Sequence, residues 1–185
     1  TAMRGYGADW TLTQYFVWYY LEHGRQFRPD DVHTGNLLSA WDALEAGVTT
    51  TVDWSHGLQS VDHAEAAVDA LQSVPGRFVL AYGNIQAGPW TADPAVRSFL
   101  ERRRGDLYGW QLAFDVTGDP AFPERPAFEV ARELDLPVTT HAGVWGATND
   151  DGIRLLHENG FMNESSVYVH AATLTTDPYH RIAAT

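Results

Sequence analysis

The sequence has no cysteine, and this absence excludes disulfide bonds and thiolate metal ligands. It suits a reducing compartment, so we expect a cytoplasmic protein. Basic residues are also few: 12 Lys and Arg stand against 24 Asp and Glu, which gives a formal net charge of -12. A nucleic acid or an anionic membrane attracts clustered cations, and no apolar run approaches the roughly eighteen residues of a membrane span. We therefore expect neither nucleic acid nor membrane as a partner.

The content of apolar residues is that of a folded globular protein. Of the 185 residues, 44% are hydrophobic and 12% are aromatic, which is enough to build a core. The length predicts a single domain over residues 1–185. The chain begins at Thr1 and stops inside a predicted helix at Thr185, so we expect both ends to be cut and the domain to be incomplete.

Stretches with helical spacing of apolar residues alternate with short β-branched runs. Helices are predicted over 9–23, 29–46, 61–74, 93–104, 123–135 and 149–159, and a last one opens at Asp177-Pro178. Strands are predicted over 48–54, 77–82, 107–114, 136–141 and 167–170. This alternation implies an α/β fold with a parallel sheet and right-handed crossovers. The pattern does not separate an open doubly wound sheet from part of a closed barrel.

Two further stretches are interpreted as structural. The aromatic residues within 9–23 fall at helical spacing, with Asp9 or Thr11 as the cap, and they predict core packing in preference to a ligand box. The run Arg102, Arg103 and Arg104 is interpreted as the solvated C-terminal end of a helix, where cations favour the helix dipole.

Two histidines stand where apolar strands end. His141 lies in the stretch Leu136–Trp145, LPVTTHAGVW, which breaks at a glycine, and His170 closes the run SVYVH. In parallel α/β folds the reacting residues lie at the C-terminal ends of the strands. Two neighbouring strands would therefore place both imidazoles at the same edge of the sheet. Imidazole is a common metal ligand and titrates near neutrality, which suits a ligand and a proton carrier. Simple hydrogen bonding of each ring to a loop stays open.

Other candidates follow the remaining strands. Asp53 and His56 follow the strand 48–54, and Asp115 follows the strand 107–114; each is also a candidate for a cap or a loop contact. Asp53 and Asp115 facing each other would suit a paired-carboxylate glycosidase, and this stays open. The sequence has no GxSxG, and no phosphate-binding glycine motif follows a strand. The other histidines are interpreted as surface or packing residues: His23, His33, His63, His157 and His180.

Three segments resemble a known family in their order and spacing. They read SAWDALEAGVTTTVDW over 39–54, LPVTTHA over 136–142 and VYVHAATLTTDPYHRIAAT over 167–185. Together they are similar to the metal-dependent amidohydrolase superfamily, in its branch of aminohydrolases and chlorohydrolases that act on purines, pyrimidines and triazines. The resemblance extends across nearly the whole chain.

This resemblance implies a (β/α)8 TIM barrel, of which the chain covers approximately strands two to six with their helices. It makes His141 the metal ligand of the fifth strand and His170 the catalytic acid/base residue of the sixth. The His-x-His metal pair of the family's first strand is absent, and the family pattern places it ahead of Thr1 and the last two strands after Thr185. One divalent metal ion is implied, with zinc first and iron as the alternative.

The resemblance also implies a substrate pocket and a reaction. Many deaminases of this branch carry glutamate three residues after the fifth-strand histidine, and Val144 occupies that position here. Without this glutamate, the resemblance leaves two possibilities besides the usual deamination: hydrolytic dechlorination, or a reaction that uses another proton donor. Trp90, Trp145 and His56 are expected to shape the pocket beside Val144. The reaction implied is hydrolysis of a C–N or C–Cl bond of a small heterocyclic or amide substrate by a metal-activated water.

With a single histidine of the family's ligand set, we expect weak metal binding and an inactive chain. The alternative is a non-catalytic α/β binding or structural module that needs no further ligands. A barrel cut at strands two and six exposes two strand edges and an apolar interior, so we expect a homo-oligomer. A stable monomer would favour the module.

Overall fold

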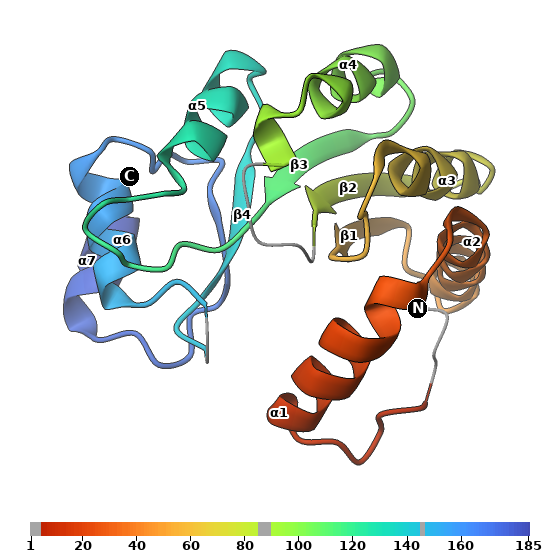
Figure 1. The fold of residues 1–185 in the computed structure, drawn as a ribbon, viewed down its shortest axis with the longest axis horizontal. Helices are drawn as coiled ribbons and strands as arrows, with labels where there is room; N and C mark the ends of the chain where they lie inside the picture. Colours follow the sequence, from red (N-terminus) through yellow and green to blue (C-terminus); the bar gives the residue numbers. More distant parts are fainter. Residues whose placement is uncertain (1–4, 85–89, 145–146) are drawn as a thin grey trace. The chain divides into compact units, whose positions relative to one another are not determined.

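The computed structural model describes residues 5–84, 90–144 and 147–185. Five strands alternate with helices along the chain (Figure 1), and every described strand pair is parallel. The predicted α/β class is therefore confirmed. The chain forms two compact units: the first comprises Thr1–Trp90 and Pro94–Trp110, and the second comprises Thr91–Asp93 and Gln111–Thr185.

The first unit opens with a helical segment that is rich in aromatic residues. Helix α1 (Leu12–Gln14) is capped by Thr11, whose hydroxyl accepts a hydrogen bond from the backbone nitrogen of Gln14 at 3.3 Å. The π-helix η1 (Tyr15–His23) and the 3-10 helix η2 (Gly24–Gln26) continue it. The prediction of core packing is wrong here, because η1 has no buried residue and Trp18 is 53% exposed. A helix that is apolar around its whole circumference presents more surface than one neighbouring layer can cover.

The next elements of the first unit form an α/β repeat. Helix α2 (Pro29–Glu45) has Pro29 in its first turn, followed by two aspartates at the positive end of the helix dipole. It ends before Gly47, whose φ of 82° lies in the left-handed region that glycine adopts without strain. Strand β1 (Thr50–Ser55), helix α3 (Val61–Gln72) and strand β2 (Arg77–Gly83) follow. The two strands pair in register from Thr50 opposite Arg77 to Ser55 opposite Tyr82.

The core of the first unit is built on the alanine-rich face of α3. This face buries small residues, which allow close packing, together with residues of β2 and α4: Ala64, Ala67, Val68, Leu71, Phe78, Leu80, Tyr82 and Phe99. A polar contact fixes the loop before α2 to α3, since His63 Nε2 lies 2.8 Å from the carbonyl oxygen of Phe27. His63 is thus a packing residue, as the sequence suggested.

Helix α4 (Pro94–Arg103) ends in the arginine run. The prediction of a solvated helix end is wrong for Arg103, whose side chain is only 13% exposed. Its guanidinium bonds to Glu65 and Asp106 and lies 2.7 Å from Asp69. Carboxylates on α3 and after α4 therefore draw this arginine inward, because a buried guanidinium needs paired acceptors. Arg102 fits the prediction better, since its side chain is 55% exposed.

The second unit repeats the alternation of strands and helices. Helix η3 (Trp90–Ala92) leads into it, and strand β3 (Gly109–Ala113) begins in the first unit and continues into the second. The remaining elements are α5 (Arg125–Glu133), β4 (Val138–Ala142), α6 (Asp150–Glu158), β5 (Val167–His170) and α7 (Thr176–Ala183). β3 pairs with β4, and β4 pairs with β5.

Apolar side chains from α5, α6 and the neighbouring loops form the core of the second unit. Its buried members include Val116, Phe122, Phe128, Ile153, Leu156, Phe161 and Leu174. The ends of α6 are fixed locally: Asn149 accepts a hydrogen bond from the backbone nitrogen of Gly152 at 3.0 Å, and Gly160 follows the helix with a φ of 66°. Across the described residues of both units, no helix combines the length and the apolar character that crossing a membrane requires.

Candidate functional site

His141 lies near the C-terminal end of β4, as its position in the sequence predicted. Its side chain is 18% exposed, so the ring is mostly buried but reaches the surface. The chain turns immediately afterwards at Gly143, whose φ is 59°. A Cβ atom at Gly143 would lie 2.9 Å from both the backbone nitrogen and a side-chain carbon of Leu174. The loops after β4 and β5 therefore pack too closely for a larger residue.

The carboxylate of Asp115 holds His141 at two points. The backbone nitrogen of His141 donates to Asp115 Oδ1 at 2.8 Å, and ring Nδ1 lies 3.1 Å from Oδ1 and 3.2 Å from Oδ2. An ionised carboxylate can only accept hydrogen bonds, so Nδ1 carries the ring proton. In the neutral ring, Nε2 then carries the lone pair. In this tautomer Nε2 is the atom that can bind a metal ion or accept a proton.

Two buried threonines support this carboxylate. Thr140 Oγ1 donates to Asp115 Oδ1 at 3.3 Å and lies 2.6 Å from Thr148 Oγ1. Thr148 also accepts a hydrogen bond from the backbone nitrogen of Val116 at 2.9 Å. The loop that carries Asp115 is thus bonded to Thr140 on β4 and to Thr148 in the loop after β4, and such support fixes the geometry of a functional side chain.

The ring of His170 lies beside that of His141 because the backbone of His170 departs from the regular strand conformation. The register sets Val169 opposite His141 and His170 opposite Ala142, and strict alternation would therefore point the two histidines to opposite faces. His170 has a φ of 73° and Ala171 one of 53°, which is a sparsely populated conformation for residues with a side chain. The two imidazole rings consequently stack, with centroids 5.7 Å apart and planes inclined by 15°.

Val144, a predicted pocket residue, follows His141 by three positions and belongs to the same unit. It lines a small cavity of about 200 Å³ together with Gly143, Asp150 and Thr173. Thr173 closes one side, because its hydroxyl donates to the carbonyl oxygen of Gly143 at 2.5 Å. Trp145 lies outside the described residues.

Trp90 and His56, the other predicted pocket residues, belong to the first unit. The ring of Trp90 stacks on Tyr82 with centroids 5.1 Å apart. His56 follows β1 and lies 4.2 Å from Trp54, centroid to centroid. Each of these residues is thus engaged by aromatic neighbours of its own unit.

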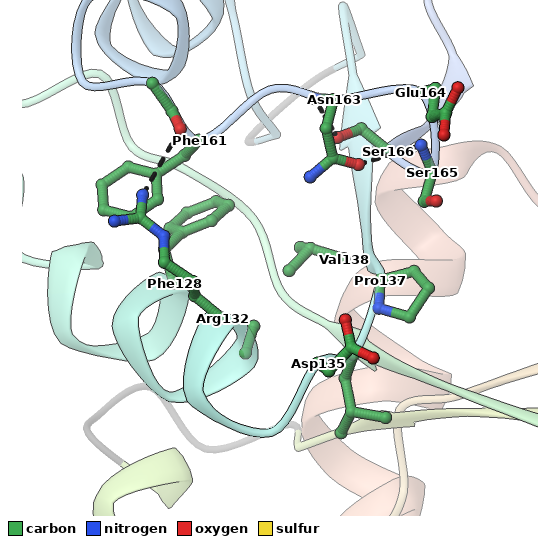
Figure 2. Close-up of a pocket in the computed structure, with 13 residues that line it drawn as sticks. Phe128, Arg132, Asp135, Pro137, Val138, Phe161, Asn163, Glu164, Ser165 and Ser166 are labelled. Atoms are coloured by element: carbon green, nitrogen blue, oxygen red, sulfur yellow. Dashed lines mark hydrogen bonds between the residues drawn. The ribbon is translucent and has the colours of Figure 1, made fainter.

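A larger cavity in the second unit lies elsewhere. Its volume is about 460 Å³, and it is lined by residues at the start of β4 and just before β5, at the strand ends opposite to His141. Figure 2 shows Arg132 lying against Phe161 at its wall, with the guanidinium carbon 4.6 Å from the ring centroid. Size alone would select this cavity, but the paired imidazoles and their carboxylate lie at the opposite strand ends.

Two parts of the polar arrangement were not predicted from the sequence. Asp115 was a candidate acid, and the structure makes it a partner of His141. Asn36 on α2 donates to Asp53 Oδ2 at 3.0 Å, and no motif marked Asn36. In the described parts of the chain, no three His, Asp or Glu side chains gather closely enough to hold a metal ion. Comparisons of this chain with models of known families, with curated proteins and with solved structures gave no match.

Proposed function

We propose that this chain carries part of the catalytic centre of a metal-dependent hydrolase of the amidohydrolase type. The reaction is hydrolysis of a C–N or C–Cl bond in a small heterocyclic or amide substrate, that is, deamination or dechlorination by a metal-activated water. His141 is the proposed metal ligand and His170 the proposed catalytic acid/base residue, within part of a (β/α)8 barrel that comprises approximately strands two to six. The proposed location is the cytoplasm.

The observation that carries this proposal is the stacked pair of His141 and His170 at the ends of adjacent parallel strands. Strand ends of this kind are where βα folds place their reacting groups. A histidine whose Nδ1 proton bonds to a carboxylate is the usual form of a metal-ligating imidazole, because the carboxylate fixes the tautomer and the ring. Asp115 gives His141 that partner.

An imidazole nitrogen is therefore a suitable type of ligand for a divalent ion. The described residues supply fewer ligands than such a site needs. Zinc and iron sites of enzymes take three or more protein ligands, and no such group occurs within the described chain. His141 Nε2 is the atom that would hold the ion. When bound, a divalent ion lowers the pKa of its water toward neutrality and so supplies the nucleophile.

The remaining chemistry belongs to this chain's own side chains. The exposed ring of His170 is placed to take a proton from the nucleophile and to return it to the leaving group, because imidazole exchanges protons near neutrality. Asp115 is a positioning residue that acts through His141. The loop residues Val144 and Thr173, which follow the two histidines in the sequence, line a small cavity and are proposed to limit the size of the substrate.

Calorimetric titration of zinc into the metal-free 185-residue chain tests this proposal. We expect binding of one ion per chain that is lost in His141→Ala and weakened in Asp115→Asn. His180→Ala, a change of an exposed histidine on α7, is the matched control and should leave binding unchanged. Zinc binding that is indifferent to His141→Ala would overturn the proposal. Because the described ligand set is short, we expect no turnover by this chain itself, and substrate turnover without metal would also contradict the mechanism.

A non-catalytic α/β binding module is the second candidate. The cavity of about 460 Å³ favours it, since that cavity is larger than the one lined by Val144 and its lining includes no histidine. If this candidate is correct, small-molecule binding will respond to Arg132→Ala and not to His141→Ala. The same pair of variants distinguishes the two functions in one set of titrations.

A further inference from the structure

A cavity in the first unit lies at the C-terminal end of β1. Its volume is about 260 Å³, and residues of η1, α2 and the end of β1 line it. Drug-sized ligands occupy pockets that begin at about 300 Å³, so this cavity suits a smaller molecule. Strand ends of this kind are also where α/β folds bind ligands.

Aromatic rings form much of the cavity wall. Tyr15 and Tyr19 stack with centroids 5.2 Å apart and planes inclined by 16°. Tyr20 meets the ring of His56 edge to face at 5.3 Å, and Trp54 lies 4.2 Å from the same histidine. Tyr15, Tyr19, Tyr20, Trp54 and His56 all line the cavity. Three aromatic residues of η1 therefore line this cavity, and none of η1 is buried in a core.

A carboxylate lies in the same wall. Asp53 is partly buried and accepts a hydrogen bond from Asn36 Nδ2 at 3.0 Å. Burial raises the pKa of Asp53, and it outweighs the opposing effects, which include hydrogen bonds from Asn36 and Ser55. Burial also raises the pKa of Tyr19, and the nearby charge of Asp53 adds to this rise. The carboxylate and the tyrosine ring are therefore close enough to interact.

The second carboxylate of the cavity, that of Asp31, is already paired with the guanidinium of Arg28. Asp31 lines the same wall, and its Oδ2 accepts hydrogen bonds from Arg28 Nε at 3.1 Å and from the Arg28 backbone nitrogen at 2.9 Å. The side-chain hydrogen bonds of Asp53 come from Asn36 and Ser55. Asp53 is therefore the carboxylate of this wall that stands outside the Arg28–Asp31 ion pair and can face a bound cation.

We propose that this cavity binds a small organic cation, of the alkylammonium class, with Asp53 as its counter-charge and the faces of Tyr15 and Tyr19 against its alkyl groups. Aromatic faces attract a cation that lies within about 6 Å of the ring centroid, and they favour quaternary ammonium over strongly hydrated metal ions. A partly buried carboxylate adds the long-range attraction that rings lack. The site uses residues of the first unit, whereas the proposed hydrolase chemistry uses His141 and His170 of the second unit.

The probe is choline, compared with its uncharged isostere 3,3-dimethyl-1-butanol, titrated into the 15N-labelled full chain and followed by NMR. Choline is expected to shift the side-chain indole signal of Trp54 and the amide signals of residues 53–57 in a saturable way. The neutral isostere is expected to bind at least tenfold more weakly. Sodium chloride at equal concentration corrects for ionic strength.

Two variants and one control locate the site. Asp53→Asn is expected to weaken choline binding at least tenfold, and Tyr19→Leu several-fold. Tyr108→Leu replaces a tyrosine that is 69% exposed and lies outside the cavity, so it should leave binding unchanged. The thermal unfolding of each variant is recorded in parallel, and Asp53→Asn is expected to remain folded because an amide preserves the hydrogen bond from Asn36.

The dependence on pH gives a separate readout. Choline binding should tighten as pH rises through the pKa of Asp53 and then level off. The other titratable groups that line the cavity are Asp31 on α2, His56 after β1, and Tyr15, Tyr19 and Tyr20 on η1. Arg28 lowers the pKa of Asp31, so Asp31 is already ionised in this range. His56→Gln distinguishes any contribution from the imidazole. Equal binding of choline and its isostere, or unchanged binding by Asp53→Asn, would overturn the proposal.

Discussion

A single carboxylate, that of Asp115, bonds to both the backbone nitrogen and the ring Nδ1 of His141, at 2.8 and 3.1 Å. This pairing sets the tautomer of the ring before any ligand arrives. Asp115→Asn should therefore shift neutral His141 away from the Nδ1–H form, because an amide can present either a donor or an acceptor to the ring. Long-range 1H–15N NMR measures the two tautomers directly.

The same variant has an expected effect on metal binding. Removing the partner of a ligating histidine lowers metal affinity by about 10 to 100-fold, and we expect a zinc affinity change within this range. Glu129→Gln removes an exposed carboxylate from α5 in the same unit and serves as the control. An unchanged tautomer in Asp115→Asn would show that the carboxylate does not determine the state of the ring.

A substitution of Thr148 tests how the hydrogen bonds next to Asp115 and His141 contribute to stability. Its side chain is fully buried, and it accepts the backbone hydrogen bond of Val116 at 2.9 Å. Thr148→Val should lower the free energy of unfolding by about 1–3 kcal/mol, because a buried donor then lacks its acceptor. Thr148→Ser keeps the hydroxyl and should recover most of this loss. Urea unfolding measures the change, and hydrogen exchange at the Val116 amide should accelerate only in the valine variant.

Element boundaries were predictable where one residue type has a strong local preference. Thr11 as a cap, Pro29 at a helix start and Gly160 at a helix end all act within one helical turn, so the local sequence determines them. The alternation of strands with helices likewise follows from the period of apolar residues. These features placed His141 and His170 at strand ends before any coordinates were known.

The features that required the structure depend on contacts between distant residues. The sequence could not show that His170 adopts a φ of 73°, because no glycine or turn motif marks the position, yet this conformation is what brings its ring beside His141. The burial of Arg103 arises from carboxylates 34 and 38 residues away. Pairing of Asp115 with His141 spans 26 residues. Tertiary packing sets each of these, and local propensity does not.

Arg103 and Arg102 form a matched pair for measuring burial. Both contact Glu65, but their side chains are 13% and 55% exposed. Arg103→Ala should lower the free energy of unfolding by roughly 2 to 3 kcal/mol, somewhat less than a fully buried ion pair, because its carboxylates keep contact with water. Arg102→Ala should lower it by less than about 1 kcal/mol. Guanidinium chloride would mask such charge effects, so urea unfolding is the measurement, and equal losses would show that burial does not set the contribution of each arginine.

Self-association through the edge of β1 is a further expectation. Within the described residues, β2 is the strand that pairs with β1, and Val52 on β1 is 51% exposed. An exposed apolar edge strand favours pairing with a second chain, and a charged side chain there opposes it. Val52→Lys should therefore shift the chain toward the monomer in light scattering coupled to size exclusion. Leu38→Lys, on α2 and 46% exposed, is the control; if it dissociates the assembly equally, the interface lies on the helices.

Asp53 should also make the stability of the chain depend on pH. Burial raises its folded pKa, so the folded state binds its proton more tightly than the unfolded state, whose value is about 3.9. Ionised Asp53 therefore opposes folding above the folded pKa, and this effect fades as pH falls toward the unfolded value. Asp53→Asn should stabilise the chain at pH 7 and have little effect near pH 3.5, as measured by urea unfolding at both values.

Asp9→Asn, at an exposed position, controls for the change in net charge. If Asp53→Asn destabilises the chain at pH 7, the hydrogen bonds of the carboxylate outweigh its burial. If it stabilises the chain while choline binding is lost, the same side chain that lowers stability supplies the binding charge. That outcome would explain why a carboxylate stands among tyrosines at the end of β1, since an amide there would give a more stable fold without a counter-charge.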